Sequence, residues 1–268
     1  MKNDTMKELI VLKVGGSVIT DKFSEQPKVN EQNLRRIVKE IGSAYDKDRM
    51  SLVFIHGVGS FGHPIVKRTG IHEGIEREEQ LIAFAETQRL QNELNNIVTK
   101  LLIEEGVPAF PCQASSFAVM DSKKLVKMDI EAIEGLIGIG IVPVLYGVPA
   151  YDKKQKSSIL SGDQIAPYLG SRLNAKRIIH GTNVAGIFTS DPKKNSKARL
   201  IPEINKENID KVKEYLTGST ATDVTGGMFG KIMEVMNVGI EAQIINALIP
   251  NNIVKAIKGE GIGTIIRP

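Results

Sequence analysis

The chain has 268 residues, 25% charged and 41% hydrophobic, a balance typical of a folded globular protein and not of a disordered or fibrous one. Its 35 basic and 31 acidic side chains give a formal charge of +4, and aromatic residues make up only 5%, so the composition does not indicate a nucleic acid partner. A single cysteine, Cys112, excludes an intrachain disulfide, and residues 1–13 lack the apolar run of a signal peptide, so we expect a cytoplasmic protein without membrane spans.

The N-terminal part alternates short apolar runs with helical stretches. Residues 9–14 form an apolar run that stops at two glycines, the pattern of a buried strand that feeds a tight turn. Residues 31–44 carry apolar side chains at helical spacing, and residues 51–55 predict a second strand. Residues 80–105 predict a long amphipathic helix. Its expected apolar stripe comprises Leu81, Phe84, Leu90, Leu94, Ile97, Val98 and Leu101.

The same alternation continues to the end of the chain. Further strands are predicted over residues 107–111, 142–146, 177–181, 243–246 and 263–266. Helices are predicted over residues 129–138, 163–173 and 227–239, a hairpin or exposed loop over 151–158, and a polar loop over 189–199. Because such alternation requires crossover connections, we predict an α/β fold with a mainly parallel sheet covered by helices on both faces. Ligands then bind at the carboxyl ends of the strands.

Four glycine clusters lie where these elements meet: residues 13–17, 56–63, 161–163 and 223–231. Glycine lets the backbone approach a ligand closely, and the amides at a helix start attract anions, so the clusters predict a phosphate site. Lys13, Lys22 and Lys231 adjoin the clusters and would supply positive charge.

The glycines of the second cluster, Gly57, Gly59 and Gly62, also match the dinucleotide-binding fingerprint, and glutamates follow within residues 76–79. That fingerprint requires its acidic residue at the end of a second strand, whereas here a long helix follows with no strand between, so a nicotinamide enzyme is disfavoured. The P-loop motif and the catalytic-loop signature of protein kinases are both missing from the sequence, which excludes those two classes.

Taken together, these motifs resemble the amino-acid kinase superfamily and, within it, the archaeal-type isopentenyl phosphate kinases. Residues 13–22 resemble the opening motif, residues 56–64 the phosphate-acceptor loop, residues 161–164 the central loop and residues 222–231 the nucleotide-side motif. The histidine that ends the acceptor loop, here His63, separates this group from relatives that act on carboxylates.

The resemblance implies an open αβα sandwich in which residues 1–174 bind the phosphate acceptor and residues 175–268 bind ATP, with one continuous sheet. It implies ATP-dependent phosphorylation of isopentenyl phosphate to isopentenyl diphosphate, for isoprenoid biosynthesis. Mg²⁺ would be held by the ATP phosphates and not by side chains. It also implies a homodimer.

The resemblance further assigns roles to individual residues. Lys13 and Lys22 would contact the transferred phosphoryl group, and Asp163 would orient the lysines. The acceptor phosphate would be held by Val58, Gly59, His63 and Gly162. The nucleotide would be held by Gly15, Gly16, Ser17, Asn183, Phe188, Asp191, Pro192, Lys193, Gly227 and Lys231. The apolar tail of the acceptor would lie near Phe84, Phe117 or Ile159.

The sequence departs from the family pattern in three places, at four residues. Asn183 and Ala185 stand where two carboxylates are usual on the nucleotide side, Val148 replaces an aspartate, and Val58 replaces glycine or alanine in the acceptor loop. These changes leave two alternatives open: a kinase for another small phosphate or phosphonate such as fosfomycin, and a nucleotide-binding relative without turnover. Asp163 also has a purely structural alternative, as the N-cap of the helix that follows it.

Overall fold

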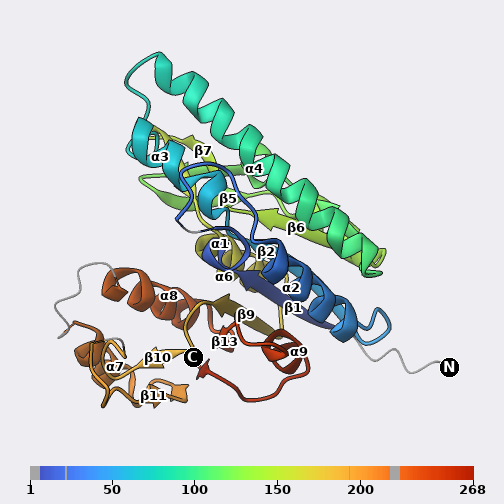
Figure 1. The fold of residues 1–268 in the computed structure, drawn as a ribbon, viewed down its shortest axis with the longest axis vertical. Coiled ribbons are helices and arrows are strands. Elements are labelled where there is room, and N and C mark those ends of the chain that lie inside the picture. The colour runs from blue at the N-terminus through green and yellow to red at the C-terminus, as the bar shows by residue number, and fades with distance from the viewer. Residues whose placement is uncertain (1–6, 22, 193, 218–223) are drawn as a thin grey trace.

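The computed structural model describes residues 7–21, 23–192, 194–217 and 224–268 (Figure 1). An eight-stranded sheet in the order β12-β14-β13-β9-β1-β2-β6-β3 forms its centre, and every neighbouring pair is parallel except β13 with β14. In chain order these strands are β1 (Glu8–Val14), β2 (Met50–His56), β3 (Ala109–Pro111), β6 (Val142–Tyr146), β9 (Arg177–Thr182), β12 (Glu203–Ile204), β13 (Ala242–Asn246) and β14 (Thr264–Ile266). The predicted mainly parallel sheet is confirmed.

Each central strand sends alternate side chains into two separate apolar cores. In β1, Leu12 and Val14 enter one core, whereas Val11 between them enters the other. The first core is covered by α1 (Gly16–Ile19), α2 (Glu31–Ala44), α4 (Glu79–Glu104) and α9 (Asn252–Ile257). The second core is covered by α5 (Glu131–Gly138), α6 (Gly162–Arg172), α7 (Ile209–Thr217) and α8 (Val224–Val238). The expected open αβα sandwich is therefore confirmed, and no helix in the described ranges is long and apolar enough to cross a membrane.

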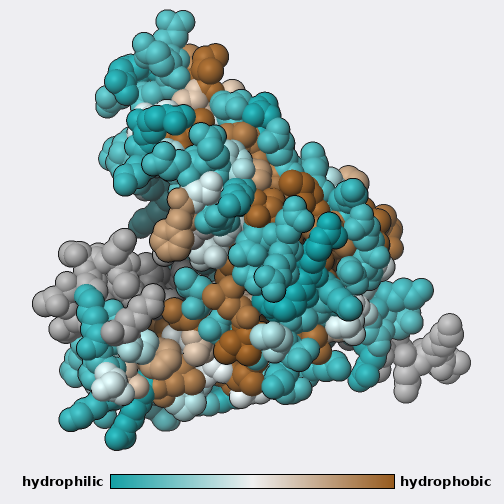
Figure 2. Space-filling model, viewed as in Figure 1, coloured by the Kyte–Doolittle hydropathy of each residue, from teal (hydrophilic) through white to brown (hydrophobic). Residues whose placement is uncertain are grey.

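The two halves of the chain occupy two parts of the molecule that share the sheet. In Figure 1 the N-terminal elements lie in the upper part, with α4 running diagonally across it, and β9, β13 and α7–α9 lie in the lower part. Figure 2 shows mainly hydrophilic residues on the upper part of this face, which carries α3 (His63–Thr69), with small groups of hydrophobic ones among them. Strand β1 pairs with β2 on one side and β9 on the other, so it joins the two parts.

A second sheet of four strands was not predicted, apart from its hairpin. Its order is β5 (Lys124–Met128), β4 (Ala118–Asp121), β7 (Val148–Asp152) and β8 (Lys156–Leu160). Asp152 is fully buried and links the β4–β5 turn to the β7–β8 turn of this sheet. Its carboxylate accepts hydrogen bonds from the backbone N–H groups of Lys123 at 2.8 Å and Lys154 at 2.9 Å. Burial opposes the charge, but these amides outweigh it and lower the pKa of Asp152 to about 2. The predicted loop 189–199 lies between β10 (Ile187–Phe188) and β11 (Leu200–Ile201), which pair antiparallel.

The apolar stripe predicted for α4 is wrong in part. Leu81 and Ile97 are 54% and 38% exposed, whereas Thr87, Gln91 and Asn95 are buried. The helix is rotated in this way because it covers polar side chains of the sheet. For example, Asn95 Oδ1 lies 3.0 Å from Nε2 of His56, which is fully buried. The contact with Asn95 gives the buried ring of His56 a hydrogen-bond partner.

Two glycine turns contact each other through their backbones at the carboxyl ends of β1 and β2. A Cβ on Gly16 would lie 2.8 Å from the backbone nitrogen of Val58, and a Cβ on Gly57 would overlap the backbone of Gly16. Neither contact can be relieved by turning a side chain. Glycine at these positions is therefore required for the two strand ends to meet.

This contact predicts that Gly57→Ala lowers the free energy of unfolding by about 1–3 kcal/mol, as overpacking does elsewhere. Gly135→Ala is the matched control, because a Cβ on Gly135 in helix α5 would meet nothing within 4 Å. That control should raise stability by about 0.5–1 kcal/mol through helix propensity. Urea unfolding followed by circular dichroism measures both, and equal effects of the two substitutions would contradict the backbone contact.

Candidate functional site

The carboxyl ends of β1, β2, β6 and β9 lie side by side at one edge of the sheet, because the four strands are parallel and adjacent. The register sets Val14 opposite both His56 and Gly181. Beyond these residues, the N–H of Gly15 donates to the carbonyl of Gly181 at 2.8 Å, and that of Gly57 donates to Val14 at 2.8 Å. Three of the glycine clusters, those at residues 13–17, 56–63 and 161–163, therefore meet at this edge.

Lys13 and Asp163 form an ion pair at this edge. Lys13 is 6% exposed, and its Nζ lies 2.9 Å from Oδ1 of Asp163, in the first turn of α6. Its side chain runs past Gly162, where a Cβ would stand 3.4 Å from the lysine Cε. Asp163, whose side chain is 25% exposed, thus holds the buried ammonium group of Lys13 at this edge of the sheet.

The structural alternative for Asp163 is wrong. The N-cap of α6 is Ser161, whose side chain accepts a hydrogen bond from the backbone N–H of Gln164 at 3.3 Å. Ser161 thereby satisfies the helix start. The carboxylate of Asp163 is directed to Lys13 instead.

The loop after β2 packs on the turn after β1. Thr20 Oγ1 accepts from the N–H of Ser60 at 3.2 Å and donates to the carbonyl of Gly16 at 2.9 Å. Gly59 adopts a φ of +46°, which favours glycine. The 3₁₀ turn Gly59–Phe61 then leads to His63 at the start of α3, and Val58 before it is half-buried.

His63 keeps contact with solvent, yet the protein packed around it lowers the pKa of its imidazole through desolvation. The ring is therefore mainly neutral at pH 7 when no ligand is bound. A bound anion would favour the charged form and raise that pKa.

The described residues expected on the nucleotide side, apart from Gly15, Gly16 and Ser17, lie after β9, around β10 and in α8. Asn183 is exposed after β9, and Phe188 is half-buried in β10, at the start of the loop that contains Asp191 and Pro192. Gly227 and Lys231 lie in α8. Lys22 and Lys193 lie outside the described residues.

Sequence reasoning missed a buried histidine beside the ion pair. His180 is 2% exposed, lies opposite Lys13 in the register of β1 with β9, and places Nδ1 3.7 Å from Oδ1 of Asp163. The available signal was a histidine after two isoleucines and directly before a glycine, inside a predicted strand.

Sequence reasoning also missed a buried polar cluster between α4 and the strand ends. Tyr146 stacks on His56 with ring centroids 5.5 Å apart, and its hydroxyl receives a hydrogen bond from Gln88 Nε2 at 2.9 Å. Burial lowers the pKa of His56 and raises that of Tyr146 to about 12, so both rings are uncharged at pH 7. This cluster supports the strand end that carries the acceptor loop.

The model of the amino acid kinase family matches residues 8–249 of the chain, which includes each of these strand ends. The chain belongs to the amino acid kinase family. It is 43% identical over 261 residues to an isopentenyl phosphate kinase of Methanothermobacter thermautotrophicus, covering 94% of this chain and 96% of the relative. It is 36% identical to an isopentenyl phosphate kinase of Methanocaldococcus jannaschii, covering 96% of this chain and 98% of the relative. A solved isopentenyl phosphate kinase structure superposes with a TM-score of 0.82 at 38% identity, covering 96% of this chain and 99% of that one.

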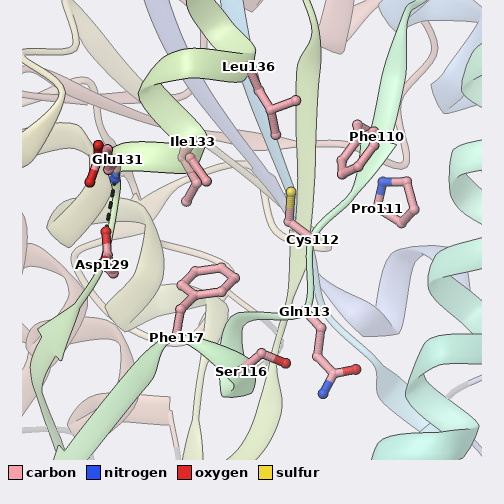
Figure 3. A pocket seen from close by; sticks show the side chains of 11 residues that line it. Phe110, Pro111, Cys112, Gln113, Ser116, Phe117, Asp129, Glu131, Ile133 and Leu136 are labelled. Atoms are coloured by element: carbon pink, nitrogen blue, oxygen red, sulfur yellow. Dashed lines mark hydrogen bonds between the residues drawn. The ribbon is translucent and has the colours of Figure 1, made fainter.

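A cavity of about 640 Å³ lies beside the end of β3, on the far side of β6 from β2 (Figure 3). In Figure 3 the side chains of Phe117, Ile133 and Leu136 surround it, together with the thiol of Cys112. Of the three side chains expected near the acceptor's tail, Phe117 lines this cavity. Burial raises the pKa of the Cys112 thiol to about 11.

This shift predicts that Cys112 reacts slowly with thiol reagents in the folded protein. The thiolate is the reactive form, and a pKa of about 11 leaves about one thiol in a thousand ionised at pH 8, against roughly a quarter of free cysteine. We expect labelling by a disulfide reagent at pH 8 to be at least about 10-fold slower than for free cysteine, since the higher nucleophilicity of the more basic thiolate offsets only part of its lower population, and to accelerate as the pH rises towards 11. Labelling in 8 M urea serves as the control, and equal rates with and without urea would contradict the prediction.

Proposed function

We propose that this member of the amino acid kinase family transfers the terminal phosphoryl group of ATP to isopentenyl phosphate, forming isopentenyl diphosphate for isoprenoid biosynthesis. The observation that carries the proposal is the Lys13–Asp163 pair at a glycine-lined strand edge that also holds the His63 loop. The likeness to isopentenyl phosphate kinases over nearly the whole chain supports the choice of acceptor.

The site suits an acceptor that is itself a phosphate. Phosphoryl transfer requires aligned oxygens and neutralised charge, and little covalent participation by the protein. A phosphate monoester has a second pKa of about 6, so it arrives ionised at neutral pH and needs no general base. A lysine ammonium such as that of Lys13 is the group that such a reaction uses.

For the acceptor phosphate, we assign Gly59, Gly162 and His63, with Val58 beside them. The two glycines present backbone at the strand ends, and the imidazole of His63 supplies a hydrogen-bond donor. On binding, the phosphate charge would raise the pKa of His63, so the ring takes up a proton and its hydrogen bond gains strength.

On the nucleotide side we assign Gly15, Gly16 and Ser17, together with Asn183 and the 188–193 loop. Lys22 would accompany Lys13 at the transferred phosphoryl group. Because Gly162 lacks a Cβ, the stem of Lys13 lies close against the start of α6, which holds the ammonium group of Lys13 near Asp163. Mg²⁺ bound through ATP oxygens would neutralise charge during transfer. Residues 1–174 would bind the acceptor and residues 175–268 the nucleotide.

A substrate panel tests the proposed function. ADP release is measured with ATP, Mg²⁺ and one acceptor at a time: isopentenyl phosphate, geranyl phosphate, fosfomycin, UMP, glutamate or aspartate. We expect the highest kcat/KM with isopentenyl phosphate. Preference for fosfomycin would favour the alternative kinase, and tight ATP binding without transfer to any acceptor would favour the non-catalytic alternative.

His63→Ala should raise the KM for isopentenyl phosphate by about 10–100-fold and leave the KM for ATP nearly unchanged, because one hydrogen bond to a charged oxygen is lost. In the unaltered protein, the KM for isopentenyl phosphate should also rise from about pH 6.5 to pH 8.5, since binding takes up a proton that is lost as the pH rises through the pKa of the bound state. His72→Ala is the matched control, because His72 is 42% exposed and pairs with Glu73. Equal rises in both KM values would remove the assignment of His63 to the acceptor.

We further propose that the protein is a cytoplasmic homodimer that associates through the edge of the sheet formed by β3. Strand β3 ends the sheet order, and Phe110 on it is 47% exposed. Ile103 on α4, which packs against β3, is 56% exposed. A second copy would cover these apolar side chains, which a solitary chain leaves in water.

Phe110→Glu should convert the dimer into a monomer, because it sets charges against each other across the two-fold interface. Val126→Glu is the control, since Val126 is also 47% exposed but lies on β5 of the second sheet. Light scattering coupled to size-exclusion chromatography gives the mass of each. A monomeric unaltered protein, or a dimeric Phe110→Glu variant, would contradict the proposed interface.

A further inference from the structure

Two side chains of helix α6 bind the outer edge of the second sheet. Strand β5 lies at the end of the strand order in that sheet, and its outer edge packs against α6. The side-chain amide of Gln164 accepts a hydrogen bond from the N–H of Leu125 at 3.0 Å and donates one to the carbonyl of Lys123 at 3.2 Å. One turn later, the hydroxyl of Tyr168 accepts from the N–H of Met128 at 3.0 Å and donates to its carbonyl at 3.3 Å. The two side chains thus pair with β5 as a neighbouring strand would.

The turn that presents the carbonyl of Lys123 to α6 has an unfavourable backbone conformation. Ser122 and Lys123 have φ angles of 51° and 67°, a region that glycine and asparagine favour in two-residue hairpin turns. Asp152 stabilises the turn, because its carboxylate accepts from the N–H groups of Ser122 at 3.1 Å and Lys123 at 2.8 Å. Strain of this kind persists only where surrounding contacts fix it, and it often marks a functional constraint. Here the fixed carbonyl is the one that Gln164 binds.

The first turn of α6, which carries Asp163, is weakly stabilised by the helix itself. Gly162 brings backbone freedom and no side chain, and the cap from Ser161 to the N–H of Gln164 is 3.3 Å long. Pro167, inside the helix, has no N–H, so the first turn is joined to the second by one backbone hydrogen bond fewer than in a regular helix. The two hydrogen bonds of the Gln164 side chain therefore fix this turn from outside.

The second sheet is also bonded to the segment that follows α3. Ser157, fully buried in β8, donates from its hydroxyl to the carbonyl of Ile71 at 2.8 Å. The side-chain amide of Gln155 donates to the carbonyl of His72 at 3.2 Å. Since α3 begins at His63, one sheet holds both the helix of the proposed acceptor histidine and, through α6, the helix of the ion pair.

We propose that Gln164 is a positioning residue that anchors the first turn of α6 to β5 and so sets where the carboxylate of Asp163 meets Lys13. Asp163 directly precedes Gln164, and its Oδ1 lies 2.9 Å from Lys13 Nζ. A misplacement of about 1 Å near reacting groups can slow a reaction by about 100-fold. The second sheet thereby acts on phosphoryl transfer through the placement of Lys13. The inference rests on the proposed function, because that function brings the transferred phosphoryl group to this lysine.

Two variants with matched losses test the inference by steady-state kinetics with ATP and isopentenyl phosphate. Gln164→Met removes both side-chain hydrogen bonds and keeps the length of the side chain. It should lower kcat about 10-fold and leave both KM values within about twofold, because it changes the placement of Lys13 during transfer and not the binding of either substrate. Tyr168→Phe is the control, since it also removes two hydrogen bonds to β5 but lies one turn further from Asp163.

Both variants should lower the midpoint of urea unfolding to a similar extent, whereas Tyr168→Phe should keep kcat within about twofold of the unaltered protein. Equal losses of kcat in the two variants would show a general effect of the sheet edge and would overturn the proposal. An unchanged kcat in Gln164→Met would overturn it as well.

Hydrogen exchange followed by mass spectrometry separates this inference from the proposed function, because it needs no acceptor. In Gln164→Met, the backbone amides of residues 164–166 should exchange at least about 5-fold faster than in the unaltered protein, and in Tyr168→Phe they should change by less than about twofold. Unchanged exchange at the start of α6 in Gln164→Met would overturn the anchoring role. A protein that transfers phosphate to none of the acceptors would refute the proposed function, while the exchange rates would still report on the anchor.

Discussion

An ammonium group inside a protein needs an anion beside it, and the pairing of Lys13 with Asp163 meets that need where the central strand ends. The lysine side chain is 8% exposed and the aspartate 25%, so the carboxylate lies towards the open side of the site. Under the proposed function, a phosphate would compete with that carboxylate for the ammonium group of Lys13, and the pair would supply a positive charge to the substrate.

The geometry of this pair depends on how α6 begins. Ser161 caps the helix, so Asp163 is free of that structural task and can face β1. Gly162 lies between them, where a side chain would crowd the stem of Lys13. The Ser161 cap and the absence of a Cβ at Gly162 together hold the positive charge of Lys13 at the edge of the sheet. The contact between Gly16 and the loop after β2 brings the acceptor loop to the same edge.

Much of this arrangement could be predicted from the sequence, because strands, helices and glycine turns leave local signals. Helix α2 and strand β6 begin and end where their apolar periodicity predicts. The face of α4 could not be predicted, since it depends on Asn95 meeting His56 from a distant part of the chain. His180 was missed for the same reason: its meaning depends on the register of β9 with β1, and the neighbour Asp163 arrives from a separate helix.

The residues that depart from the family pattern differ in how strongly they affect the packing and charge of the protein. Val148 is fully buried in the core of β7, so an aspartate there would need a buried partner, and valine keeps the strand apolar. Val58, in the loop after β2, packs against both cores, so its methyl groups add apolar contacts there. Asn183 is exposed after β9, where the loss of a carboxylate removes charge without disturbing the core. Under the proposed function, Asn183 is the one of these three residues that ATP would meet, and because asparagine carries no negative charge, it would favour the approach of the polyphosphate oxygens.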